Sequence, residues 1–377
     1  ISRTRSLYKK NSLSVSQFKD LKQLFNLLRF SLTIILCTDD EKIITALLSG
    51  SGLKLGYLNV HEPANIFSII LRLTFLGKTE MFKKLFRSIA IQISAVLLAI
   101  TAMVFLMGSL LTAPASSAVA TLSADFPVES IQIPAADGSV VHGWLSRGQP
   151  GGGVMLLVHS MRSNRLEMLG RARFLRNQGY SVLFIDLYAH GETAGESISF
   201  GLHESDSVVA SVNYLQRTFP RERIGAIGAS LGAAAIVLAK QHLNLAAVVL
   251  ESLHPTIEEA VENRLRLHLG EYGVVLTPVI LAYLSFQLDT AMEQLSPIHK
   301  IDQLRSPVLF IAGTRDAHTT RSETERLFAA ARNPKELWIV PGAGHFNMHA
   351  YAGREYEHQV SAFLAHFLRP IETDERH

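Results

Sequence analysis

Residues 223–241 read RIGAIGASLGAAAIVLAKQ, with Gly228-Ala229-Ser230-Leu231-Gly232 at their centre. The apolar run Arg223–Gly228 predicts a strand and Leu231–Gln241 predicts a helix, so Ser230 falls at a sharp strand-to-helix turn. In that context the pattern G-x-S-x-G is typical of a turn whose strained backbone holds a serine oxygen above a sheet. We therefore interpret Ser230 as a nucleophile rather than as part of a structural Gly/Ser turn.

Outward from this turn, strand and helix patterns alternate from residue 128 onward. Val128–Ile133 and Val140–Leu145 predict a hairpin, because turn residues separate them. Later apolar runs predict strands buried on both faces: Gly153–His159, Ser181–Asp186, Arg223–Gly228, Ala246–Leu250, Pro307–Ala312 and Glu336–Val340. Helices are predicted over Arg165–Gln178, Glu204–Arg217, Leu231–Gln241, Arg321–Ala331 and Tyr351–Phe367. The fold class is therefore α/β, with a mostly parallel central sheet and helices on both faces.

A serine hydroxyl needs a general base, and the base needs an acid that orients it. In sheets of this kind ligands bind beyond the carboxyl ends of the strands, so residues just after the strands are candidates. Asp316 follows the run PVLFIA and His345 follows ELWIV. We expect His345 to be the base and Asp316 the acid, with Asp186 as a fallback acid.

An oxyanion hole needs two N–H donors. The backbone N–H of Leu231 opens the helix after Ser230 and is one candidate. The loop after the third strand supplies the other, with Met161 as first choice and Ser160 as second. His159 in the same loop is interpreted as a residue that organises the loop rather than as a base.

Residues 128–370 resemble the α/β-hydrolase superfamily, and more narrowly its serine-aminopeptidase and monoglyceride-lipase-like branch. The motifs that carry this resemblance are His159-Ser160-Met161, Asp186-Leu187-Tyr188-Ala189-His190-Gly191, the Ser230 turn, Gly313-Thr314-Arg315-Asp316 and Gly344-His345. The resemblance implies Ser230 as nucleophile, His345 as base and Asp316 as orienting acid. Two positions depart from the branch, because Ser160 and Ala189 stand where it has glycine.

The alternation stops between the strands that end at Leu250 and begin at Pro307. Residues 253–303 predict two or three helices and contain a very apolar stretch, Val274–Phe286. Such an insertion would lie over the strand ends as a small helical cap with an apolar pocket. The alternative is extra core packing.

An apolar stretch of 23 residues, Ile89–Leu111, is long enough to span a bilayer. Basic residues precede it, and Ala118-Val119-Ala120 has the form of a signal-peptidase site. The length favours an uncleaved anchor, with a cleaved signal near Ala120 or a buried helix as alternatives. The basic flank predicts a cytoplasmic N-terminus and export of everything after residue 120, to the periplasm or the outside of the cell.

The chain thus divides into residues 1–80, an 81–120 signal or anchor segment, and an expected hydrolase domain over residues 121–377. No domain is assignable in residues 1–80, and one hypothesis places them upstream of a true start at Met81. The net charge of +3 comes from residues 1–80, which hold 11 Lys and Arg against 6 Asp and Glu. The remainder therefore shows no basic footprint for nucleic acid.

These features together predict a serine hydrolase that cleaves a carboxylic ester with a hydrophobic acyl or alcohol part. A peptidase for short peptides is the alternative, with Glu251 and Glu271 as candidate partners for a substrate amine. An alternative of another class is a non-catalytic binding protein on the same fold. No metal or organic cofactor is expected, because no metal-ligand spacing and no nucleotide-binding fingerprint occurs.

Overall fold

The computed structural model describes residues 32–37, 42–49, 52–59, 63–122 and 125–368, in two compact units, Ile1–Ala99 and Ile100–His377. In the first unit, three antiparallel strands pair in the order β1-β2-β3. They are β1 (Leu32–Cys37), β2 (Lys42–Ser49) and β3 (Gly52–Asn59). Helix α2 (Pro63–Thr112) follows them in the chain and continues into the second unit.

The second unit is built on an eight-stranded sheet in the order β13-β12-β11-β10-β7-β8-β6-β5. Strands β5 and β6 form the predicted hairpin, β6 runs antiparallel to β8, and the remaining pairs are parallel. This arrangement confirms the predicted fold class. The strands are β5 (Glu129–Pro134), β6 (Val140–Ser146), β7 (Val154–Val158), β8 (Ser181–Ile185), β10 (Ile224–Ala229), β11 (Ala247–Glu251), β12 (Val308–Gly313) and β13 (Lys335–Val340).

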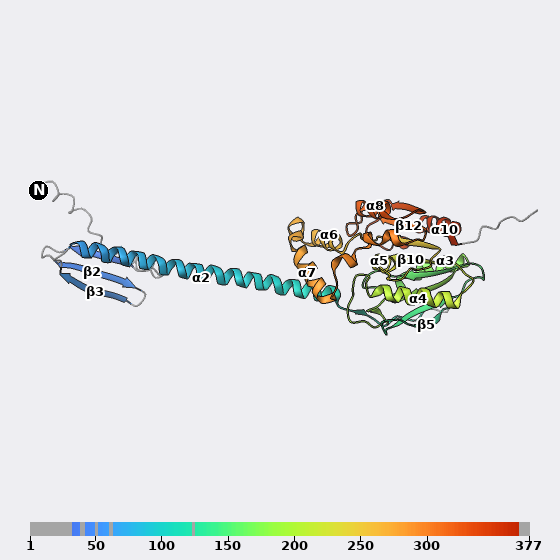
Figure 1. Ribbon diagram of the computed structural model, residues 1–377, viewed down its shortest axis with the longest axis horizontal. Coiled ribbons are helices and arrows are strands. Elements are labelled where there is room, and N and C mark those ends of the chain that lie inside the picture. Colours follow the sequence, from blue (N-terminus) through green and yellow to red (C-terminus); the bar gives the residue numbers. More distant parts are fainter. Residues whose placement is uncertain (1–31, 38–41, 50–51, 60–62, 123–124, 369–377) are drawn as a thin grey trace, which may run out of the picture. The chain divides into compact units, whose positions relative to one another are not determined.

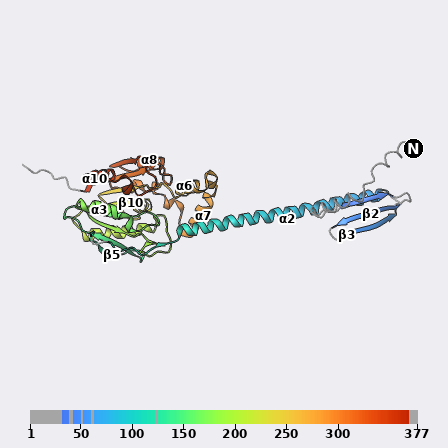
Figure 2. The same cartoon turned by 180° about the vertical axis from the view of Figure 1, so that it is seen from behind.

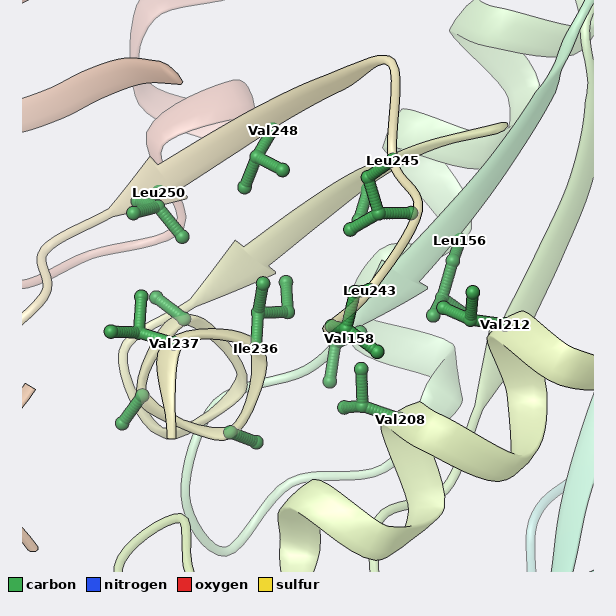
Figure 3. Close-up of a cluster of buried hydrophobic side chains, with 14 of the residues drawn as sticks. Leu156, Val158, Val208, Val212, Ile236, Val237, Leu243, Leu245, Val248 and Leu250 are labelled. Carbon is green, nitrogen blue, oxygen red and sulfur yellow. The ribbon is translucent and has the colours of Figure 1, made fainter. Parts of the chain in front are cut away.

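Helices cover both faces of this sheet. Apart from α2 and the insertion, the helices described in this unit are η1 (Arg165–Met168), α3 (Leu169–Asn177), α4 (Glu204–Thr218), α5 (Leu231–Val237), α8 (Arg321–Ala330), α9 (Met348–Ala352) and α10 (Arg354–Leu368). Strand β7 is buried on both faces of the sheet. Alternate side chains of a strand point to opposite faces, so they pack against different helices. Leu156 and Val158 pack with α4 and α5 (Figure 3), whereas Met155 and Leu157 pack with α3 and α10.

Three local features differ from the sequence expectation. The helix predicted to reach Gln241 ends at Val237, and the chain then turns so that Leu243 and Leu245 enter the core. The predicted closing helix is divided into α9 and α10 at Gly353, whose φ of 49° breaks the helical path. Two-residue strands β4 (Ala115–Ser116) and β9 (His190–Gly191) also pair in parallel.

Between β11 and β12 the chain forms the helical insertion expected there. It consists of α6 (Ile257–Leu269), η2 (Glu271–Leu276) and α7 (Thr277–Leu288), followed by η3 (Met292–Leu295), η4 (Pro297–His299) and η5 (Ile301–Gln303). Buried side chains from α6, α7 and η3 form a separate apolar cluster. Helices α6 and α7 lie at one end of the second unit and α10 lies toward the other, in both views (Figures 1 and 2).

The apolar stretch Ile89–Leu111 lies wholly within α2. The segment Met81–Thr112 is apolar and long enough to cross a membrane, and only 6% of its most apolar window is buried. Most of its large side chains are exposed, which argues against the buried-helix alternative. The start of this helix at Pro63 shows that helical structure continues upstream of Met81.

Ala189, one of the two departures from the branch pattern, has a φ of 58°. This is the left-handed region, which costs a residue with a Cβ atom about 1–2 kcal/mol and explains a glycine at the equivalent place. Ala189 is fully buried in the main core cluster. Burial of its methyl group offsets part of that cost.

Candidate active site

Ser230 lies between β10 and α5, at the turn that the sequence predicts. Its backbone has φ 50° and ψ −106°, a strained conformation for a residue with a side chain. A Cβ atom at Gly228 would lie 2.6 Å from the amide nitrogen of Ala233, and one at Gly232 would overlap the carbonyl oxygen of Val158. The two glycines therefore permit the close approach of strand and helix that exposes the serine oxygen.

The three residues predicted as nucleophile, base and acid lie within hydrogen-bond distance of one another. His345 Nε2 is 3.2 Å from Ser230 Oγ, and His345 Nδ1 is 2.9 Å from Asp316 Oδ2. Asp316 follows the end of β12 and His345 follows the end of β13. The parallel sheet brings these strand ends to the same edge as Ser230.

Asp316 is buried and accepts several hydrogen bonds besides that of His345. The N–H groups of His318 and Thr319 each donate to Oδ1 at 2.9 Å, and Ser252 Oγ donates to Oδ2 at 2.9 Å. Burial is the largest single influence and would raise the pKa of Asp316, but these hydrogen bonds and the nearby His345 together hold it below its ordinary value. Asp316 is therefore an anion at neutral pH and keeps the Nδ1–H of His345 oriented.

The loop after β7 is held by His159, which is fully buried. Its Nε2 accepts a hydrogen bond from the N–H of Leu187 at 3.1 Å, so its Nδ1 must carry the proton that is donated to the carbonyl of Ser160 at 2.7 Å. Burial, followed by repulsion from His190, lowers the pKa of His159 to about 4. The neutral ring is thus a fixed support for the loop, as the sequence predicted.

This support sets the direction of the next peptide group. In a trans peptide the carbonyl and the following N–H point in opposite directions. Because the carbonyl of Ser160 faces His159, the N–H of Met161 faces the other way, and it donates to no acceptor among the described residues. The N–H and hydroxyl of Ser160 both donate to Glu167 Oε2, at 3.0 and 2.7 Å. Of the two candidate donors, only Met161 is uncommitted.

Two histidines to which the sequence analysis assigns no catalytic role lie beside the predicted base. The ring centroid of His318 is 5.0 Å from that of His345. His254, only 8% exposed, follows β11 by three residues and shares an electrostatic interaction with His345. Burial, then the charge of Arg264, lowers the pKa of His254 to about 3, and burial and His345 lower that of His318. The position of His254 just after the end of β11 was a signal that sequence reasoning could have used.

The remaining carboxylates named from the sequence are committed elsewhere. Asp186 accepts from the N–H and the guanidinium of Arg165, so it is not the acid of this site. Glu251 is buried in a pair with Arg171, and Glu271 pairs with Arg266 on the surface. No described carboxylate other than Asp316 hydrogen-bonds to His345.

The buried neutral histidines make stability fall with acid. In the folded chain His159 and His254 have pKa values of about 4 and about 3, below the ordinary 6.5. As pH falls, these two histidines are therefore protonated in the unfolded chain before they are protonated in the folded chain. A depressed histidine pKa contributes stability that is complete above the unfolded value and is lost as pH falls. From pH 7.5 to 5.5 we expect these two groups together to lower the free energy of unfolding by ~3 kcal/mol.

Urea titrations of the full chain in detergent at the two pH values would measure this drop. In the variant His254→Gln the drop should be smaller by about half of that joint contribution, because one of the two groups no longer titrates. An unchanged drop in His254→Gln would contradict the assignment.

The architecture matches one known class of protein. A family model described as "Alpha/beta hydrolase family" matches residues 140–358, and the chain belongs to that family. It is 28% identical to the Bacillus subtilis protein YqkD over 236 residues, covering 62% of this chain and 77% of that one. It is 29% identical to the Mycobacterium tuberculosis protein Rv2307c over 254 residues, covering 67% and 82%.

Among solved structures, the Pyrococcus furiosus esterase Pf2001 resembles this chain with a TM-score of 0.56 and 21% identity. The match covers 67% of this chain and 97% of the esterase. At this identity the likeness shows the shared fold. The narrower resemblance to the serine-aminopeptidase and monoglyceride-lipase-like branch stays a prediction.

Proposed function

We propose that this α/β hydrolase cleaves carboxylic esters through an acyl-enzyme formed on Ser230. The observation that carries the proposal is the hydrogen-bonded series from Ser230 Oγ through His345 to Asp316. As Oγ attacks the carbonyl carbon, His345 Nε2 takes the hydroxyl proton, and Asp316 stabilises the imidazolium. The N–H groups of Leu231 and Met161 are the donors to the developing oxyanion.

The tetrahedral intermediate collapses when the bond to the alcohol oxygen breaks. His345 then gives its proton to the departing alcohol, which leaves the acyl group on Ser230. Water enters, loses a proton to His345 and attacks the acyl carbon. A second collapse releases the acid and returns the proton to Ser230 Oγ. Every proton is accounted for by His345, so no cofactor enters the cycle.

An ester is preferred over a short peptide because the two acids that the sequence offers for holding a substrate amine have other partners. The two candidates for that role, Glu251 and Glu271, are paired with arginines. The solved neighbour Pf2001 is described as an esterase, which agrees with this choice. The peptidase alternative predicts turnover of aminoacyl-p-nitroanilides instead.

Membrane anchoring through Ile89–Leu111 is part of the proposal. Cleavage after Ala120 would remove β4 and Val119, which is 8% exposed and packs in a core cluster. The N–H groups of Ala115 and Ser117 also donate to the carbonyls of Ala189 and Gly191 at 2.8 Å. Because this segment belongs to the folded body, an uncleaved anchor is favoured over a removed signal.

The test uses the full chain in detergent with p-nitrophenyl esters of increasing chain length and with aminoacyl-p-nitroanilides. We expect turnover of the esters and labelling by a fluorophosphonate probe, which reacts only with an activated serine. Turnover of the anilides alone would replace the esterase proposal with the peptidase. Folded protein that neither turns over substrate nor reacts with the probe would leave a binding protein.

Ser252 has a φ of 50° and is a positioning residue in this scheme, because it donates to the same Asp316 oxygen as His345. Ser252→Ala removes one hydrogen bond to an anion, worth about 1.5–3 kcal/mol. We expect kcat to fall about tenfold or more, with KM nearly unchanged, as follows when orientation of the base is impaired. Steady-state kinetics with an ester substrate measure kcat and KM separately. An unchanged kcat would show that His345 and the two N–H donors suffice to hold Asp316.

A further inference from the structure

Helix α7 is apolar on its exposed face as well as on its buried face. Ile280, Leu284 and Leu288 are buried at helical spacing against the insertion cluster. Three exposed residues, Val279, Ala282 and Phe286, form a second stripe, and Val275 of η2 precedes it by one turn. Phe286 is 81% exposed and Val275 is 76% exposed. We call these four residues the outer α7 face.

The neighbouring helix α6 shows what a water-facing helix of this insertion carries. Its exposed and half-exposed positions include Glu258, Glu262 and Arg266. In contrast, no charged residue occurs between Tyr272 and Leu288. An exposed apolar stripe without charges is unfavourable in water and marks an interaction surface.

The last turns of the apolar helix α2 pack directly on α7. Val104 is 3% exposed and belongs to the same apolar cluster as α6 and α7. The Phe105 ring meets the Tyr283 ring edge-on at 5.2 Å, and Ser109 Oγ is 2.8 Å from the Tyr283 hydroxyl. A Cβ atom at Gly108 would overlap the Tyr283 ring. The contact is therefore close and specific.

The other side of this helix end is also fixed to the hydrolase body. The guanidinium of Arg162 donates to the carbonyls of Leu110 and Ala113, and the carbonyl of Thr112 accepts from the N–H of Ile198 at 2.7 Å. These contacts all lie within the second unit. The end of the apolar stretch and α7 thus share one rigid frame.

This frame sets the depth of α7 if Ile89–Leu111 spans the bilayer. At 1.5 Å per residue, Phe105 lies about 9 Å inside the end of the stretch at Leu111. Helices that lie in a membrane surface bury their apolar face about 5–10 Å into the boundary between headgroups and acyl chains. Tyr283, in contact with Phe105 and Ser109, places α7 at that depth.

The insertion also connects the outer α7 face to the catalytic residues. Helix α6 packs against α7 in the apolar cluster, and Asn263 of α6 donates to the carbonyl of His318 at 3.3 Å. The ring of His318 in turn lies 5.0 Å from that of His345. The insertion that carries the outer α7 face is therefore also the element that borders the candidate site.

We propose that the outer α7 face is a docking surface for the lipid bilayer that holds α2, and that the substrate is a membrane-dissolved ester with an acyl chain. The substrate part of this proposal rests on the proposed ester hydrolysis. The docking part rests on the contacts between α2 and α7. The occupant is lipid rather than protein, because the adjoining apolar surface is itself a candidate membrane span.

Docking is tested by a fluorescent probe on the full chain in phosphatidylcholine vesicles. Cys37→Ser leaves no native cysteine, and Phe286→Cys then carries an environment-sensitive dye. We expect blue-shifted emission that is quenched by lipids with brominated acyl chains. The same dye at His358→Cys, an exposed position on α10, should report water and escape quenching.

A water-like, unquenched signal at residue 286 would overturn the docking proposal. Blue-shifted emission without quenching would also overturn it, because the face would then be covered by a second copy of the chain. Neither readout depends on hydrolysis, so failure of docking and failure of the proposed function are separate results.

The substrate part is tested by Val279→Ser combined with Phe286→Ser. Burying these two side chains in lipid is favourable, so their loss should lower turnover of 4-methylumbelliferyl oleate in vesicles by about tenfold or more. Turnover of p-nitrophenyl acetate in water should change less than about twofold, since the buried face of α7 is intact. Equal loss on both esters would overturn the substrate proposal. Quenching of the dye at residue 286, together with a wild-type chain that hydrolyses neither ester, would retire the proposed function and leave docking supported.

Discussion

Ser230→Ala in the full chain should lower kcat/KM for a p-nitrophenyl ester by about 10⁴-fold or more. The variant removes only the oxygen that attacks the carbonyl. The backbone hydrogen bonds of the turn remain, because the N–H of Ser230 donates to the carbonyl of Glu251 at 2.8 Å and its own carbonyl accepts from Ala234 at 3.0 Å. The backbone donors to the oxyanion also remain, so a small residual rate is expected.

The measurement pairs initial rates with fluorophosphonate labelling, since labelling does not depend on the substrate chosen. Ser322→Ala, at an exposed position on α8, is the matched control and should retain both signals. A Ser230→Ala protein that still reacted with the probe would place the nucleophile elsewhere. Loss of labelling in Ser322→Ala would point to general unfolding instead.

The residues of the candidate site that directly follow strands could be predicted from the sequence. Ser230, Asp316 and His345 each follow an apolar run that a reader can locate without a structure, and a parallel sheet brings such ends together. The structure brings these three side chains together, and their catalytic role stays a prediction. Met161 was also placed correctly relative to β7, but its availability as a donor depends on hydrogen bonds of His159 and Glu167 that the sequence does not show.

Other features of the site depend on tertiary structure that no local sequence pattern indicates. His254 and Ser252 reach Asp316 and His345 only because the chain after β11 turns sharply at a φ of 50° for Ser252. The partner of Glu251 is 80 residues away along the chain, and no local pattern announces it. Glu251 therefore looked like an acid available to substrate when only its position after a strand was known.

The elements of the fold also differ in whether a local sequence pattern predicts them. The eight strands of the main sheet were largely predicted because burial on one or both faces leaves a clear apolar pattern. The pair β4–β9 was not, because two residues are too few to form a pattern. The apolar stretch of α7 predicted either a cap or core packing, and only the exposure of Phe286 on one side, with Leu284 buried on the other, shows that it has two apolar faces.

Arg171→Met should lower the free energy of unfolding by about 3–5 kcal/mol. Arg171 is fully buried, its Nε donates to Glu251 Oε1 at 2.9 Å, and its terminal nitrogen contacts the other carboxylate oxygen. Burial alone would lower the pKa of Arg171, but attraction to Glu251 raises it above its ordinary value. Without the guanidinium, only the Tyr356 hydroxyl, at 2.6 Å, remains to stabilise a carboxylate that has no access to water.

The double variant Arg171→Met with Glu251→Leu distinguishes an effect of this ion pair on stability from an effect on catalysis. Replacing both partners of a buried ion pair by apolar groups removes the uncompensated charge, so we expect most of the lost stability to return. Chemical denaturation of the wild type, Arg171→Met and the double variant measures this recovery. The carbonyl of Glu251 holds the N–H of Ser230, but that bond is made by the backbone and survives both changes. Ester turnover should therefore recover with stability.

A double variant that regained stability, kept ester turnover and lost an aminoacyl-anilide activity of the wild type would instead identify Glu251 as the acid that receives a substrate amine, and would favour the peptidase.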